Sequence, residues 1–123
     1  MREAQMTNLD IQCAELGRQI AGIRDMDEKT INAALSVLEE QGLYAMFLYL
    51  QARYSNVARD LNREALEFLQ SVFQGQLNEI NDILNAVEKL SENLDDLLFA
   101  RDLLRTALSY ARYHLKAKGG GTS

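Results

Sequence analysis

The feature that most constrains the fold is a helical repeat near the end of the chain. From Leu94 to Leu115, stripe positions recur at alternating spacings of three and four residues. Six of the seven positions are apolar and the seventh is an arginine: Leu94, Leu97, Arg101, Leu104, Leu108, Ala111 and Leu115. A helix with this repeat must bury a continuous stripe against other helices. The sequence therefore predicts a long C-terminal helix packed in a helical bundle.

The opposite face of this helix is cationic, with Arg105, Arg112 and Lys116. Two interpretations stay open. Cations near a helix C-terminus complement its dipole, and this is common in bundle helices. Alternatively, the face is free to meet an acidic surface or a nucleic acid.

Composition supports an all-α fold. The chain of 123 residues contains no proline, and 47% of its residues are apolar. It lacks the turn residues and β-branched runs of an all-β chain. We expect one domain over residues 1–118, a compact bundle of five to six helices with a long C-terminal helix. Residues 119–123, GGGTS, are expected to form a flexible tail.

Turn signals divide the bundle into helices. Thr7 or Asn8 is expected to cap a first helix over 9–23, in which Gly17 and Gly22 weaken the last turns. The other expected segments are a helix from the Asp25–Glu28 capping box to Gln41 with Gly42 closing it, the apolar segment 43–50, a helix from Ser55 or Asn56 to Gly75, one over 77–90, and the last helix from Ser91 or Asn93.

The segment 43–50, Leu-Tyr-Ala-Met-Phe-Leu-Tyr-Leu, is apolar on every side of a helix. Such a helix is stable only when other elements surround it, so we expect it at the centre of the core. On this basis Leu48→Asp is expected to unfold the protein. Its aromatic and methionine side chains are interpreted as packing rather than as a ligand-binding box, because no polar groups converge on them.

Charge, hydropathy and cysteine content limit the partners and the cellular compartment that we expect. The net charge is −5, so the chain as a whole repels polyanions and any nucleic-acid contact must be local. Residues 75–100 contain six acids and one lysine, whereas residues 101–118 contain five cations and one acid. The apolar runs are too short to span a membrane, which needs about 20 residues. Without a secretory signal, and with Cys13 as an expected buried thiol, we expect a cytoplasmic protein with no membrane partner.

Signals for catalysis are missing. There is one histidine, His114, expected at the surface, and no Glu-x-x-His pair, Cys-x-x-Cys pair or glycine-rich phosphate loop. Asp95 and Asp96 are adjacent on a helix and point about 100° apart, which is poor geometry for a carboxylate dyad. We expect no enzymatic activity, no metal and no cofactor.

Two segments resemble the small all-helical subunit of Cmr-type (type III-B) CRISPR effector complexes. The first is Gln41-Gly-Leu-Tyr-Ala-Met-Phe-Leu-Tyr-Leu-Gln-Ala-Arg53, in which a helix ends in Gly-Leu and a short apolar helix closes on a basic residue. The second is the closing segment Arg105-Thr-Ala-Leu-Ser-Tyr-Ala-Arg-Tyr-His-Leu-Lys116. The chain departs from the family in lacking its early proline, in having Tyr113 in place of a tryptophan, and in keeping only Lys116 of a basic pair.

The resemblance implies a non-catalytic subunit of an RNA-guided ribonucleoprotein. Copies would stack along the guide and target RNA beside other effector subunits, and basic residues would touch phosphates without reading sequence. The candidate contacts are Arg53, Arg59, Arg63, Arg101, Arg105, Arg112 and Lys116. Arg101 is also open to an ion pair with a carboxylate of another helix.

Two other functions stay open. One is a stand-alone helical adaptor that uses its seam and its acidic and basic halves for self-association only. The other is a small-ligand-binding regulator that uses the 43–50 core.

Overall fold

The computed structural model describes the backbone of residues 2–122 and the side chains of residues 8–119. This range forms six helices and no strand: α1 Arg2–Ala21, α2 Glu28–Gln41, α3 Leu43–Arg53, α4 Ser55–Val72, α5 Ile83–Leu90 and α6 Leu94–Thr122. The prediction of an all-α bundle of five to six helices with a long C-terminal helix is confirmed.

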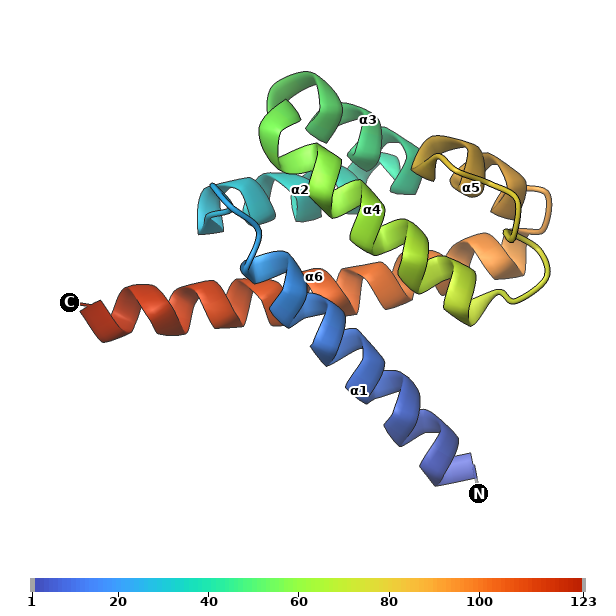
Figure 1. Cartoon of the computed structure of the whole chain (residues 1–123), viewed down its shortest axis with the longest axis horizontal. Coiled ribbons are helices and arrows are strands. Elements are labelled where there is room, and N and C mark those ends of the chain that lie inside the picture. Colours follow the sequence, from blue (N-terminus) through green and yellow to red (C-terminus); the bar gives the residue numbers. More distant parts are fainter. Residues whose placement is uncertain (1, 123) are drawn as a thin grey trace.

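The longest helix, α6, runs along one side of the bundle (Figure 1), and α2 and α5 pack against it. The short helix α3 packs against α2, α4 and α5. Helix α1 crosses α6 obliquely, and its N-terminal half extends away from the other helices. The most extensive contact between any two helices is the one between α1 and α6.

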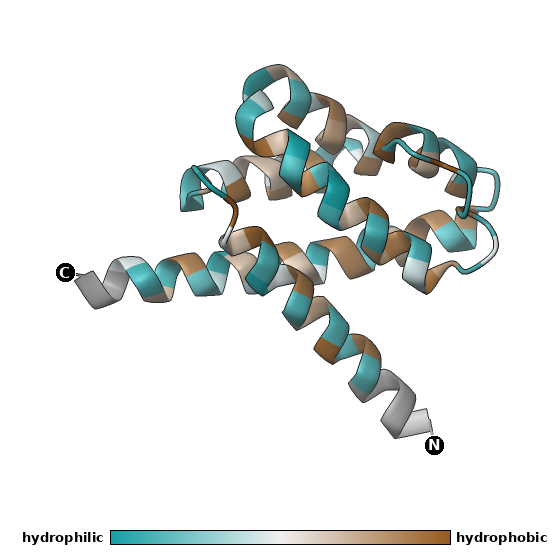
Figure 2. Ribbon diagram, viewed as in Figure 1, coloured by the Kyte–Doolittle hydropathy of each residue, from teal (hydrophilic) through white to brown (hydrophobic). Residues whose placement is uncertain are grey.

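One hydrophobic core joins all six helices. The middle of α6 contributes six buried residues: Ala100, Leu103, Leu104, Ala107, Leu108 and Ala111. Figure 2 shows hydrophobic and hydrophilic positions interleaved along α6. The predicted stripe is therefore confirmed at Leu104, Leu108 and Ala111. Leu97 and Leu115 are partly buried against the core. The stripe is wrong at Leu94, the first residue of the helix, which is 66% exposed.

The crossing of α1 and α6 depends on a glycine. A Cβ atom at Gly17 would lie 2.5 Å from the Cβ of Tyr110 and 2.6 Å from the carbonyl oxygen of Ala107. Both distances are shorter than van der Waals contact, so the two helix backbones meet where a side chain is missing. The sequence suggested only that Gly17 weakens α1, whereas its position in the fold gives it a packing role.

The start of α1 and the cap of α2 differ from the sequence predictions. Helix α1 is already formed at Thr7 and Asn8, because no glycine or proline interrupts the residues before them. Helix α2 is capped by Asp27, whose Oδ1 accepts from the Thr30 backbone N–H at 2.8 Å and from the Thr30 hydroxyl at 2.7 Å. These hydrogen bonds lower the pKa of Asp27. Asp25 instead adopts a positive φ of 69°, and its Oδ2 accepts from the side chain of Asn56.

The start of α4 matches the sequence prediction but its cap does not. Helix α4 begins at Ser55 with Tyr54 at the cap position, and there is no side-chain cap, because the tyrosine side chain does not provide one and Ser55 and Asn56 already lie within the helix. The helix ends at Val72, and Gly75 follows in a turn with a φ of +88°.

The predicted helix over 77–90 is wrong in its first part. Helix α5 begins at Ile83, and Asp82 caps it by accepting from the Asn85 backbone N–H at 3.2 Å. Residues 77–79 form a bend and a turn, and residues 80–82 have no regular secondary structure. The side-chain amide of Gln70 donates to the carbonyl oxygens of Leu77 at 3.1 Å and Ile80 at 3.0 Å. A side chain of α4 thus satisfies carbonyls that a helix would have satisfied itself.

Helix α6 begins after Asn93, whose side-chain oxygen accepts from the Asp96 backbone N–H at 3.1 Å, as predicted. Its backbone continues to Thr122, through most of the segment predicted to form a tail. Ser123 lies outside the described residues.

Helix α3 is buried on one side rather than on every side. Gly42 closes α2 with a φ of +99°, and its N–H donates to the carbonyl of Leu38, as its place in the sequence predicted. Met46 and Phe47 are buried in the core, whereas Leu48 is 50% exposed. The expectation that Leu48→Asp unfolds the protein is therefore wrong, because a carboxylate there remains in water.

A pair of substitutions tests the orientation of α3. Phe47→Asp should leave the protein unfolded, because an unpaired buried carboxylate costs several kcal/mol, comparable with a domain stability of about 5–15 kcal/mol. Leu48→Asp should cost about 1 kcal/mol or less, since only part of its apolar surface is buried. Urea unfolding followed by circular dichroism measures both. Equal destabilisation by the two substitutions would contradict the orientation.

A second pair tests the helix crossing. Helix propensity alone makes Gly17→Ala stabilising by about 1 kcal/mol. The close approach to Ala107 and Tyr110 predicts the opposite sign, a net loss of about 1–3 kcal/mol from overpacking. Gly22→Ala is the matched control, because a Cβ there meets its nearest atoms at 3.6 Å. Thermal unfolding of both variants gives the sign, and a stabilised Gly17→Ala protein would rule out the crossing.

Candidate nucleic-acid interface

The seven candidate cations lie in two groups on different helices. Arg53 ends α3, and Arg59 and Arg63 lie on α4. The other group lies on α6 and contains Arg101, Arg105, Arg112 and Lys116. The two groups differ in how far their charges are already neutralised.

Acidic residues of the same chain meet the cationic face of α6. The Nε of Arg105 lies 2.5 Å from Oε1 of Glu39 on α2, without hydrogen-bond geometry, and its Nη1 donates to Asp102 at 3.3 Å. The Nζ of Lys116 lies 3.9 Å from Oε2 of Glu28, at the start of α2. The face that the sequence left open is therefore partly covered by α2.

The remaining cations of α6 have different surroundings. Arg101 is partly buried, its Nε has no hydrogen-bond partner, and it forms no ion pair with any described carboxylate. The suggested ion pair of Arg101 is absent among these residues. The guanidinium carbon of Arg112 lies 5.9 Å from the ring centre of Tyr113, within the range of a cation–π contact.

The α3–α4 group carries the more available charge. Arg53 and Arg59 are exposed, and neither forms an ion pair with a carboxylate in the described part of the chain. Arg63 lies 3.1 Å from Asp60 and 3.7 Å from Glu64, so its charge is locally compensated. Arg53 and Arg59 are therefore the best-placed cations for an external anion.

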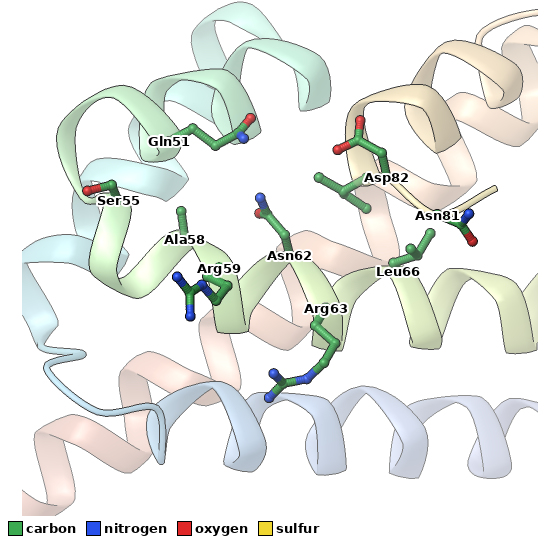
Figure 3. A pocket seen from close by; sticks show the side chains of 10 residues that line it. Gln51, Ser55, Ala58, Arg59, Asn62, Arg63, Leu66, Asn81 and Asp82 are labelled. Carbon is green, nitrogen blue, oxygen red and sulfur yellow. The ribbon is translucent and has the colours of Figure 1, made fainter.

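A recess of about 410 Å³ is lined in part by Arg59 and Arg63. It is bounded by the end of α3, one face of α4 and the start of α5. Figure 3 shows Gln51, Asn62 and Asp82 around one opening, with the two arginine heads directed away from it at the rim. Ala58, Leu66 and Ile83 supply apolar surface.

Asn62 is the unusual residue of the recess. Its Oδ1 is buried and has no hydrogen-bond partner. A buried acceptor without a donor is costly, so Oδ1 of Asn62 lowers the free energy of unfolding. Sequence reasoning missed Asn62 because a single polar residue on a helix face carries no signal. It missed Asp82 because 77–82 was expected to be helical.

Elsewhere in the described structure, the side chains that could bind a metal ion or act as nucleophiles do not cluster. Among the described side chains, no three of His, Cys, Asp and Glu come together in a way that could hold a metal ion. His114 is exposed, as expected. Cys13 is buried, and its thiol lies 3.7 Å from the carbonyl oxygen of Leu103. Burial, with a smaller contribution from Asp10, raises the pKa of Cys13 to about 11.

In the part of the chain that the structure describes, none of the helices combines the length and apolar character needed to cross a bilayer. No protein-family model, no curated protein and no solved structure matches this chain.

The surroundings of Cys13 predict an unreactive thiol. With a pKa of about 11, roughly one thiol in a thousand is ionised near pH 8, and only the thiolate is nucleophilic. Alkylation by iodoacetamide should therefore be about 100-fold slower in the native protein than in urea. Mass spectrometry of timed samples measures both rates. Rapid labelling of the native protein would contradict this prediction and make Cys13 a candidate nucleophile.

Proposed function

We propose that this chain is a non-catalytic small subunit of a type III-B CRISPR effector ribonucleoprotein. In this role it contacts guide and target RNA through phosphates, beside other effector subunits and copies of itself. The observation that carries the proposal is that Arg53 and Arg59 are exposed and form no ion pair with a described carboxylate, and that Arg59 also lines a recess of the surface. The resemblance of residues 41–53 and 105–116 to that family supports it.

The charge distribution fits a subunit better than an independent RNA-binding protein. A net charge of −5 repels a polyanion at long range, so the isolated chain binds RNA weakly at physiological salt. A few local cations contribute once neighbouring subunits hold the strand in place. In such an assembly they position the backbone and do not read bases.

The geometry changes the order of the candidate contacts. Arg105 and Lys116 are directed to Glu39 and Glu28, so binding a phosphate would compete with ion pairs inside the chain. Exposed ion pairs of this kind contribute about 1 kcal/mol or less, so the competition weakens an RNA contact without abolishing it. Arg53 and Arg59 carry the main role, and Arg63 a secondary one.

A self-associating adaptor is the second candidate. Leu94, Leu98 and Phe99 are large apolar side chains exposed along the start of α6. Exposed apolar residues that lie together favour a protein contact. If self-association is the whole function, the arginines of α3 and α4 are dispensable.

The proposal predicts which RNA species accompany the protein. A tagged full-length chain recovered from its native cells should retain large effector subunits and short guide RNAs. The double reversal Arg53→Glu with Arg59→Glu should reduce RNA retention. It should also reduce the magnitude of the slope of log K against log salt concentration by about 1.4. Each phosphate contact with a single strand contributes about 0.7 to that slope, and two contacts are lost. RNA sequencing and salt-graded elution measure both effects.

The matched control is Arg24→Glu with Lys118→Glu, which changes the net charge equally at two exposed positions outside the recess. It should leave RNA retention unchanged. Recovery of a self-associated chain without RNA would refute the proposal and support the adaptor.

A further inference from the structure

Large apolar side chains are exposed together at the start of α6. They are Leu94, Leu98 and Phe99, and we call them the apolar end of α6. Leu94 and Leu98 lie one turn apart on the same face of the helix. The ring of Phe99 makes an edge contact with the buried ring of Phe73, with 6.0 Å between the ring centres, so the core holds Phe99 in place. Exposed apolar residues that lie together and are held rigidly favour a protein contact.

Acidic residues beside the apolar end decide the charge of what can cover it. Asp95 is exposed, lies three positions before Leu98 and four before Phe99, and therefore shares their side of the helix. It forms no ion pair with a cation among the described residues. Glu92 is exposed just before the helix, and its ion pair is with the exposed Lys89. Two apolar ends packed against each other would bring these carboxylates together, so the surface favours a cationic partner.

The other end of the same helix has the complementary character. After Asp102 the sequence contains no acidic residue. Tyr113 is exposed, and the guanidinium carbon of Arg112 lies 5.9 Å from its ring centre. Lys116 is exposed and lies 3.9 Å from Glu28, an ion pair that is weak enough to be exchanged for another. Arg112, Tyr113 and Lys116 form what we call the basic end of α6, which combines an exposed aromatic ring with two cations.

The two ends are too far apart to meet within one chain. From Leu94 to Lys116 the helix rises by about 33 Å, at about 1.5 Å per residue. Figure 1 shows the C-terminal part of α6 extending beyond the other helices, whereas the start of α6 lies beside α5 on the other side of the molecule. A contact between the two ends therefore joins two copies. Because the surfaces differ, each copy in such a pair keeps one end available for a further copy.

We propose that the basic end of α6 in one copy binds the apolar end of α6 in the next, so that copies join head to tail in an open chain. This goes beyond the proposed function, which names copies of the protein but no surface between them, and it requires no RNA. The net charge of −5 opposes association at long range. At about 0.1 M salt that repulsion is screened beyond about 10 Å, whereas ion pairs inside the contact are shorter than this distance.

The test is sedimentation equilibrium of the RNA-free full-length protein at about 0.1 M salt over a range of concentrations. The average mass should rise beyond that of two copies as the concentration increases. Leu98→Ser and Tyr113→Ser each remove an apolar side chain from one of the two ends without changing the charge. Each should raise the dissociation constant roughly threefold to tenfold, because apolar area is lost from the contact.

An exchange of charge between the two ends assigns the contact. Glu92→Lys with Asp95→Lys gives a protein with cations at both ends, and Arg112→Glu with Lys116→Glu gives one with acids at both ends. Each variant alone should associate at least about tenfold more weakly, because like charges then meet in the contact. An equimolar mixture of the two should recover association, since every acidic end can then meet a basic one. Unfolding of either variant could not produce this recovery.

Glu15→Lys with Glu67→Lys is the matched control for the first variant, because it makes the same change in net charge at exposed positions of α1 and α4. It should not weaken association. A mass that levels off at two copies and is insensitive to Tyr113→Ser would indicate a symmetric dimer and overturn the inference, as would a monomer at every concentration. RNA retention after Arg53→Glu with Arg59→Glu tests the proposed function separately, so the two can fail independently.

Discussion

The fold depends on the close approach of α1 and α6 at Gly17. The added atom of any other side chain would overlap with the backbone of Ala107 and the side chain of Tyr110. Small residues on the facing side, Ala107 and Ala111, are fully buried at the same crossing. Because α1 also contacts α4, this crossing connects the long helix to the part of the bundle that carries the recess. The stability of the bundle and the position of α4, which lines the recess, therefore both depend on the α1–α6 crossing.

The helical content was predictable because its causes are local. A spacing of three and four residues, a glycine after Gln41 and an asparagine before the last helix each act within a few positions. The predicted helix boundaries were wrong where residues far apart in the sequence contact each other. Asp25 lies two residues before the cap position, where its carboxylate accepts from Asn56 of α4, and the carbonyls of Leu77 and Ile80 accept from the side chain of Gln70. Leu48 is exposed because no helix covers that side of α3.

The candidate site shows the same division between local and distant causes. The sequence identified which residues are cationic, but their surroundings depend on the tertiary fold. Arg105 forms an ion pair with Glu39, which lies far from it in sequence, so the charge of Arg105 is partly neutralised within the chain. Arg53 and Arg59 have no such partner in the described part of the structure. The recess arises from three separate segments, and no single one of them carries a recognisable motif.

The side chain of Gln70 has an effect beyond its own hydrogen bonds. It fixes the turn that leads to Asn81 and Asp82, while Asn62 lies two helical turns earlier on the same helix. Opposite walls of the recess are thus anchored to one rigid rod. A guest entering between them would find its contacts already arranged, and would lose little free energy to ordering the walls. Selectivity in such a preorganised opening comes from the shape and polarity of its walls rather than from closure around the guest.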